Sequence, residues 1–178
     1  MNIKKALIFL VIVFVLTAAG TEWKLFTSES GGFSVRFPRE PEKQTEQVNM
    51  PVGEGYKKIN MYMIMVRDPG FTYLVVYNEM PEWNPEDADY IFDQARDGGI
   101  ASLNGKLISE KDIRLDSHPG REIKLNNSKG LYYRSRMYLV EDRFFQISVT
   151  TLEKEAASSN IAKFLNSFEL LSEEDQDN

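Results

Sequence analysis

The clearest structural pattern in the chain is Leu131-Tyr132-Tyr133-Arg134-Ser135-Arg136-Met137-Tyr138-Leu139-Val140. It alternates two sets of side chains: Leu131, Tyr133, Ser135, Met137 and Leu139 on one face, and Tyr132, Arg134, Arg136, Tyr138 and Val140 on the other. A period of two residues is that of a β-strand, whose successive side chains point to opposite faces of a sheet. The stretch therefore predicts a strand that presents a different surface on each side.

Turn signals on both sides of this strand predict further strands next to it. Residues 126–130 (Asn-Asn-Ser-Lys-Gly) precede it, and residues 141–143 lead into an apolar strand over 144–152. Upstream, strands are expected over 107–115 and 121–125, with the turn Ser-His-Pro-Gly at 117–120 between them. Because short loops join antiparallel neighbours, these strands are expected to form an antiparallel sheet.

The N-terminal half of the domain predicts more strands. A hairpin is expected from residues 22–26 and 33–37 across Gly31-Gly32, and two strands from 56–66 and 71–80 across Asp68-Pro69-Gly70. The apolar run 73–77 favours a central strand that is buried on both faces. Residues 39–55 are polar and carry prolines and glycines, so they are interpreted as a mobile connection with at most a short edge strand.

Two helices complete the predicted domain. Asn84 is expected to cap the first, with Pro85 at its first position, and apolar residues recur at helical spacing from Ala88 to Leu103. Gly98-Gly99 indicates either close packing on the sheet or the end of the helix. A second apolar stripe runs from Ala157 to Phe168. Helices must cover the apolar faces of the sheet, so the predicted fold class is α+β, an antiparallel β-sheet sandwiched by helices.

Composition excludes several classes of protein. The chain has 178 residues and no cysteine, which excludes a disulfide framework, a thiolate zinc site, a cysteine nucleophile and a lipid-anchored bacterial lipoprotein. Its formal net charge is −6, from 21 Lys and Arg against 27 Asp and Glu. Nucleic-acid binding requires a cationic surface, so this balance argues against it and disfavours binding to an anionic membrane.

The N-terminus predicts export from the cytoplasm. Lys4 and Lys5 precede an apolar run from Ala6 to Leu16, and small residues follow at 17–21. This order is that of a signal peptide, assigned to residues 1–20, with cleavage after Ala19 or Gly20. The alternative is an uncleaved membrane anchor, although 6–20 is shorter than the roughly 20 residues that span a bilayer. Residues 21–171 then form a single domain, and 172–178 a disordered acidic tail, of a periplasmic or extracellular protein.

The face formed by Tyr132, Arg134, Arg136 and Tyr138 is the candidate interface, because protein interfaces are enriched in tyrosine and arginine. The alternative is an outward strand face with cation–π pairs and cross-strand salt bridges, or one half-covered by a helix. No membrane insertion is expected once the signal peptide is removed, and the pattern does not determine the oligomeric state.

Other candidate residues carry weaker signals for chemistry. His118, the single histidine, lies in a turn beside Ser117, where it is expected to be exposed rather than to act as a general base. Asp87, Asp89 and Asp93 do not match a calcium loop and are expected on the solvent face of the first helix. No metal site, cofactor or catalytic group is predicted, so the chain is not expected to be an enzyme.

Met61, Met63 and Met65 alternate along one strand. Stacked thioethers could hold Cu(I), but methionine more often fills gaps in a core. The three methionines are therefore predicted to face the core of the domain.

The pattern of residues resembles the Mog1/PsbP-like superfamily, in particular its exported bacterial members of unknown function. The resemblance rests on four segments in order: 32–41 (GFSVRFPREP), 119–122 (PGRE), 132–140 (YYRSRMYLV) and 163–168 (KFLNSF). It implies an α/β/α sandwich and a binding or assembly module rather than an enzyme. Some members serve photosystem II on the lumenal side and another binds a small nuclear GTPase; the bacterial-type leader favours neither role here.

The expected function is therefore an exported, non-catalytic accessory protein that binds a protein partner in the cell envelope. The alternative is a small-ligand carrier, with a pocket between the hairpin at Gly31–Pro38 and the helix that begins at Asn84.

Overall fold

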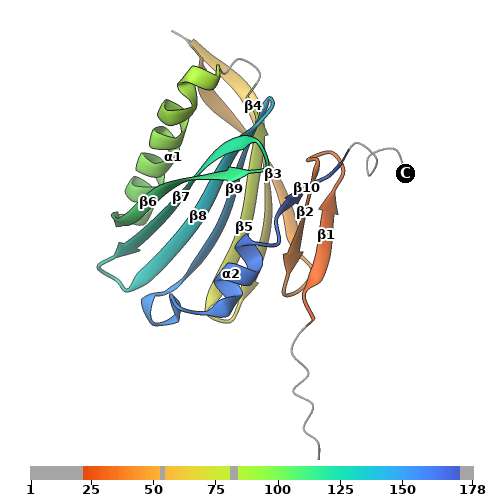
Figure 1. The fold of residues 1–178 in the computed structure, drawn as a ribbon. Helices are drawn as coiled ribbons and strands as arrows, with labels where there is room; N and C mark the ends of the chain where they lie inside the picture. The colour runs from red at the N-terminus through yellow and green to blue at the C-terminus, as the bar shows by residue number, and fades with distance from the viewer. Residues whose placement is uncertain (1–21, 53–54, 81–83, 173–178) are drawn as a thin grey trace, which may run out of the picture.

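The computed structural model describes residues 22–52, 55–80 and 84–172 (Figure 1). The predicted signal peptide and residues 173–178 of the predicted tail lie outside these ranges. Ser172, where that tail was expected to begin, is described and exposed. Within the described ranges, no helix is both long and apolar enough to cross a membrane.

Ten strands, two α-helices and two short 3-10 helices make up the described chain. In order they are β1 (Lys24–Ser28), β2 (Phe33–Phe37), β3 (Glu42–Val52), β4 (Gly55–Asp68), β5 (Phe71–Glu79), η1 (Pro85–Asp87), α1 (Ala88–Leu103), β6 (Gly105–Leu115), β7 (His118–Asn127), β8 (Leu131–Val140), β9 (Arg143–Leu152), η2 (Glu153–Glu155), α2 (Ser159–Leu165) and β10 (Glu169–Leu170).

The large sheet has seven antiparallel strands in the order β3-β4-β5-β9-β8-β7-β6. The hairpin β1-β2 and the short strand β10 form a separate sheet of three strands. Figure 1 shows α1 on one side of the large sheet and α2 with the small sheet on the other. The predicted α+β fold with both faces covered is confirmed, and the small sheet is an addition to it.

Alternate residues of β8 supply two separate cores. Tyr132 and Tyr138 pack with α2 and the small sheet, whereas Tyr133 and Met137 pack with α1. The first core is aromatic: the ring of Phe33 lies 5.2–5.8 Å from the rings of Tyr77, Phe145 and Phe168. These contacts fasten the small sheet to the large one, so the two sheets form one folded unit.

Two strand predictions are wrong. The edge strand that was allowed for within residues 39–55 is present, but it is long: β3 covers residues 42–52 and pairs with β4 along its whole length, so this segment is not a mobile connection. Its polar sequence follows from its exposure at the edge of the sheet. Strand β5 is buried on one face only, because Leu74 and Val76 stay partly exposed where α1 packs on β6 and β7 instead.

The helix ends also differ from the prediction. One 3-10 turn precedes α1, closed by the bond from Asp87 N–H to the Asn84 carbonyl (2.8 Å), and Asp87 is the N-cap of the α-helix. The Asn84 side chain instead accepts a bond from Glu86 N–H at 3.3 Å, within the tighter turn. The helix continues through Gly98-Gly99 and ends at Asn104, which adopts a left-handed conformation (φ 47°). The second helix is shorter than its apolar stripe, because the chain leaves it to form β10.

Candidate functional site

The four predicted interface residues do share one face of β8, but that face is largely covered. Tyr132 and Tyr138 are only 7% and 5% exposed, and Tyr138 stacks on Phe168. The side chains of Arg134 and Arg136 are 21% and 20% exposed. Tyr132 and Tyr138 therefore do not face outward, because α2 and the segment after it cover this side of the strand. The binding of a partner at this face stays a prediction. The alternative of a half-covered face with cross-strand salt bridges is what the structure shows.

Glu122, which the sequence did not single out, organises this face. It is 2% exposed, and its carboxylate accepts bonds from Arg134 Nη2 at 3.1 and 2.9 Å and from Arg136 Nε at 2.9 Å. Lys111 Nζ lies 3.5 Å away. Arg136 also donates to the carbonyl of Leu165, the last residue of α2, at 3.0 Å. Burial favours the neutral acid, yet the two arginines hold the pKa of Glu122 down at about 2.

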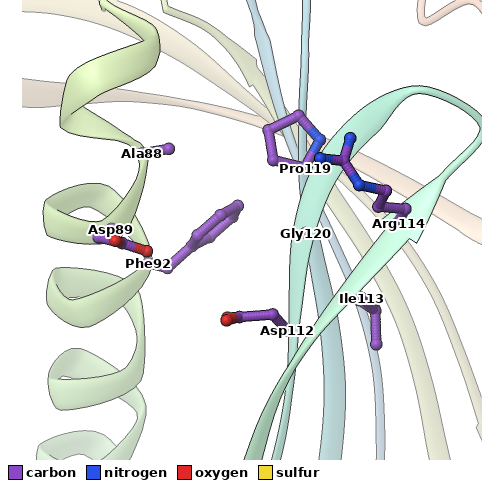
Figure 2. Close-up of a pocket in the computed structure, with 8 residues that line it drawn as sticks. All are labelled: Ala88, Asp89, Phe92, Asp112, Ile113, Arg114, Pro119 and Gly120. Carbon is purple, nitrogen blue, oxygen red and sulfur yellow. The ribbon is translucent and has the colours of Figure 1, made fainter.

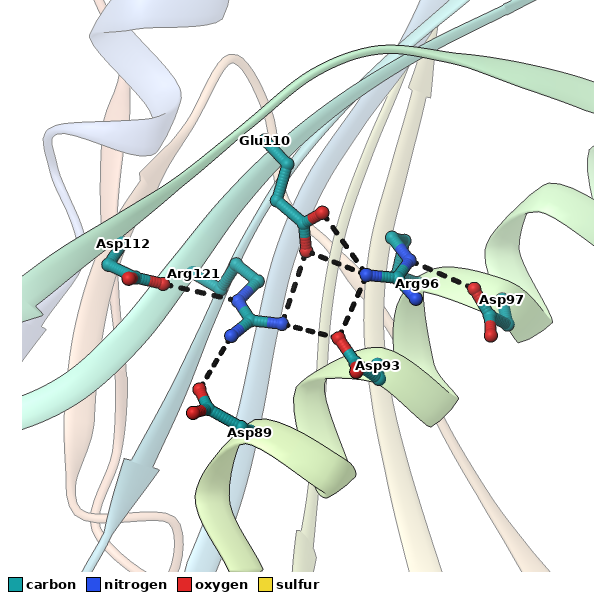
Figure 3. Close-up of polar contacts among 7 residues, drawn as sticks. All are labelled: Asp89, Asp93, Arg96, Asp97, Glu110, Asp112 and Arg121. Atoms are coloured by element: carbon teal, nitrogen blue, oxygen red, sulfur yellow. Dashed lines mark hydrogen bonds and ion pairs between the residues drawn. The ribbon is translucent and has the colours of Figure 1, made fainter.

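Arg121, the preceding residue on β7, points to the opposite face of the sheet. There a buried arginine is surrounded by acidic side chains, whereas the buried Glu122 is surrounded by basic ones (Figure 3). Arg121 is 9% exposed, and four carboxylates surround its guanidinium: Asp89 at 2.6 Å, Asp93 at 2.6 Å, Glu110 at 3.2 Å and Asp112 at 3.3 Å. Burial alone lowers the pKa of Arg121, but Glu110, Asp93 and Asp112 reverse the effect and raise it.

Arg96 of α1 extends the same network. It contacts Asp93 at 2.8 Å, Asp97 at 2.9 Å and Glu110 at 3.1 Å. Together the seven side chains in Figure 3 carry five negative and two positive charges, a net of −3.

This network joins α1 to β6 and β7, and it adds contacts that were not predicted for the helix acids. Asp89 and Asp93 were expected simply to face solvent; their side chains are 87% and 45% exposed, and both also bind an arginine that comes 32 and 28 residues later in the chain. Asp87 does not join them; it is the N-cap and its side chain makes no capping hydrogen bond. Among the described residues, no group of three or more acids or histidines is arranged to hold a metal ion.

A cleft of about 460 Å³ opens beside this network, between α1 and the hairpin of β6 and β7. It is lined by Ala88, Asp89, Phe92, Asp112, Ile113, Arg114, Pro119 and Gly120. Figure 2 shows Asp89 on α1 and Asp112 on β6 pointing into the gap from opposite sides, with the ring of Phe92 between them. The lining therefore combines apolar groups with two carboxylates and the guanidinium of Arg114.

A smaller cavity, of about 390 Å³, lies where three turns and the C-terminal end of the described chain meet. Gly31 and Gly32 of the β1–β2 turn line it together with His118, Arg143 and Phe145. His118 is thus partly covered rather than fully exposed. The predicted pocket between the hairpin and the first helix is wrong, because β1-β2 and α1 lie on opposite faces of the sheet (Figure 1).

The three methionines of β4 do not belong to either buried core. Met61, Met63 and Met65 are partly exposed, whereas Ile64 and Val66 point the other way into the aromatic core. The prediction that the methionines lie in the core is therefore wrong. They lie on the α1 side of the sheet, and α1 does not extend over them because it packs against β6 and β7.

Comparison with known proteins identifies the fold. No family model and no curated protein matches the chain. The chain is similar to the solution structure of cyanobacterial PsbP (CyanoP) from Synechocystis sp. PCC 6803, with a TM-score of 0.56 at 10% identity, over 86% of this chain and 95% of that one. It is also similar to PA94 from Pseudomonas aeruginosa, a protein of unknown function described as a putative regulator, with a TM-score of 0.39 at 16% identity, over 65% and 90% of the two chains. The match to CyanoP shows a PsbP-like fold and confirms the fold that the resemblance implied.

Proposed function

We propose that this protein is an exported, non-catalytic binding module that holds a segment of a protein partner in the cleft between α1 and the β6–β7 hairpin. The cleft is the observation on which the proposal rests. Its volume is in the range of binding sites, and its lining combines apolar groups with a few charged groups, as ligand sites do. The leader pattern of residues 1–20 supports a location outside the cytoplasm.

The chemistry of the cleft favours a basic side chain from the partner. A lysine or arginine of the partner would place its charged end against the exposed carboxylates of Asp89 and Asp112. The ring of Phe92 is already buried, with the guanidinium of Arg121 at 5.3 Å from its centre. Both carboxylates already contact Arg121, yet their side chains remain largely exposed. Because the surrounding network is net negative, a cationic group gains attraction there and an anionic one is repelled.

Site-specific crosslinking tests this proposal. A photo-crosslinking residue in place of Arg114, which is exposed at the cleft, is expected to capture a discrete envelope protein, whereas one in place of Lys24 on β1 is not. The double variant Asp89→Asn/Asp112→Asn should lose that product. Its matched control is Glu40→Gln/Glu169→Gln, which removes the same charge from exposed positions elsewhere.

Equal crosslinking from the Lys24 position, or a product that survives the loss of both aspartates, would argue against binding in the cleft. Export has its own test. Fractionation of the host followed by N-terminal sequencing should find the protein outside the cytoplasm, beginning at Gly20 or Thr21. A chain that retains Met1 in the cytoplasmic fraction would contradict it.

The alternative function, a small-ligand carrier, is favoured only by the cavity lined by Gly32, His118 and Arg143. A small acidic molecule with an apolar part would suit a site that both Arg143 and Phe145 line. Native mass spectrometry of protein purified from its host should then show an adduct that the variant Arg143→Gln lacks. A bare mass in both samples would exclude this function.

A further inference from the structure

Four cationic side chains gather around Glu122 on the face of the sheet that carries α2: Lys111 of β6, Lys124 of β7, and Arg134 and Arg136 of β8. We call this set the basic platform. The strand register places them together, because Glu122 lies directly opposite both Lys111 and Arg136, and Lys124 lies opposite Arg134. With Glu122 included, the platform carries four positive charges and one negative, a net of +3 on a chain whose formal charge is −6.

The platform is accessible from solvent at the end of the sheet. Strand β6 is the outermost strand of the large sheet, and the Lys111 side chain is 61% exposed. Lys124 is partly exposed. Helix α2 touches the platform through the carbonyl of Leu165, to which Arg136 donates. The acid Glu153 borders it, where its carboxylate accepts a bond from Asn126.

The cations of the platform are not fully compensated. One buried carboxylate faces three cations within 3.5 Å, so a charge of about +2 is left over at that point. Within the part of the chain that the structure describes, Arg134 Nε is buried without a hydrogen-bond partner. Because screening at physiological salt limits electrostatic interactions to roughly 8 Å, an approaching group senses this local charge more than the acidic remainder of the molecule.

We propose that the basic platform binds an acidic segment of a partner protein, through aspartate or glutamate side chains that contact Lys111, Lys124 and the outer edges of Arg134 and Arg136. The structure already shows how these cations hold a carboxylate, since Arg134 Nη2 reaches both oxygens of Glu122 and Arg136 Nε reaches one. Planar carboxylates match this arrangement of guanidinium donors. This surface lies on the opposite face of the sheet from the cleft, so the two sites can be tested separately.

The binding experiment uses the purified protein and fluorescently labelled peptides of eight residues. Octaglutamate is the probe, with octaglutamine as the neutral control, and anisotropy is measured at two salt concentrations. Octaglutamate should bind and octaglutamine should not, and raising the salt from 0.05 to 0.3 M should weaken binding at least about threefold.

The variant Lys111→Gln/Lys124→Gln removes two cations but leaves both arginine contacts to Glu122 in place. It should weaken octaglutamate binding about tenfold, since each exposed ion pair accounts for roughly a threefold change. The matched control Lys24→Gln/Lys58→Gln, at exposed positions on β1 and β4, should change binding less than twofold. Unfolding in urea confirms that both variants remain folded.

Equal losses in the two double variants would overturn the proposal, as would equal binding of octaglutamate and octaglutamine. Vesicles containing phosphatidylglycerol provide the last comparison. Binding to vesicles without binding to octaglutamate would mean that the platform recognises a lipid surface, and the proposal would then be wrong.

Discussion

Replacing Glu122 by glutamine removes the carboxylate that Arg134 and Arg136 share while leaving the size of the side chain almost unchanged. The two arginines hold the pKa of Glu122 at about 2, against an ordinary value of 4.5. Because one pKa unit corresponds to about 1.4 kcal/mol, the charged form stabilises the fold by about 3 kcal/mol at pH 7. Glu122 is almost fully buried, so little solvent screening reduces this value. We expect Glu122→Gln to lose about 3 kcal/mol in the free energy of unfolding.

The sign of the pH dependence distinguishes this cause from a packing defect. A group whose pKa is lowered on folding stabilises the fold fully above its unfolded value, and that stabilisation disappears as the pH falls toward the folded value. The difference between wild type and Glu122→Gln should therefore be constant from pH 7 to about 5.5, fall to about half by pH 3, and approach zero near pH 2.

Urea unfolding at pH 7, 5, 4 and 3, followed by circular dichroism, measures this difference. Subtracting the variant from the wild type cancels the titration of the other carboxylates, which the two proteins share. Glu169→Gln, an exposed acid on β10, serves as the control and should differ from wild type by less than about 0.5 kcal/mol at every pH. A constant difference between Glu122→Gln and wild type from pH 7 to pH 3, or one below about 1 kcal/mol at pH 7, would refute the reasoning.

Other substitutions test the packing and the charge network, with urea unfolding as the measurement. Arg121→Gln should cost about 2–4 kcal/mol at pH 7 because it leaves carboxylates crowded together, and the loss should shrink at pH 4; an equal loss at both values would contradict an electrostatic cause. Phe33→Ala should cost about 3–5 kcal/mol, since Phe33 is fully buried and joins the two sheets. Gly120→Ala should cost more than about 1 kcal/mol, because a methyl group there would meet the ring of Tyr138. Gly98→Ala should raise the free energy of unfolding by about 0.5–1 kcal/mol, because alanine favours the helix and its methyl group would meet no other part of the fold within 4 Å. A lower free energy of unfolding in this variant would contradict the structure.

The strands, the helices and the fold class could be predicted because their signals are local. The alternation in residues 131–140 predicted β8 with its observed bounds, and the turn residues around it predicted the antiparallel neighbours. The length of strand β3 escaped prediction because an edge strand needs no apolar face, so its sequence is like that of a loop. The prediction of a pocket between the hairpin and the first helix was wrong, because the spacing of apolar residues does not determine which face of the sheet each element covers.

The candidate sites could be predicted only in part. Arg134 and Arg136 were identified from alternation, but the burial of Tyr132 and Tyr138 depends on α2, which follows later in the chain. The sequence around Glu122 gives no sign that its side chain is buried among cations. Its contacts with Lys111 and Arg136 arise only because β6 and β8 pair with β7 on either side. Arg121 gave no signal either, since its partners Asp89 and Asp93 lie on a helix that packs on the far side of the same strand.

Most of the strands, both helices, the apolar N-terminal run and the overall charge could be obtained from the amino-acid sequence, because each depends on residues that are neighbours along the chain or on composition alone. Only the tertiary structure decided that the consecutive residues Arg121 and Glu122 point to opposite faces and gather opposite charges, acids around the first and bases around the second. Strand register brings together side chains 9 to 14 residues apart, and the packing of α1 on β7 adds a contact across 32 residues. The burial of Arg121 and Glu122 and the direction of their pKa shifts follow from those contacts.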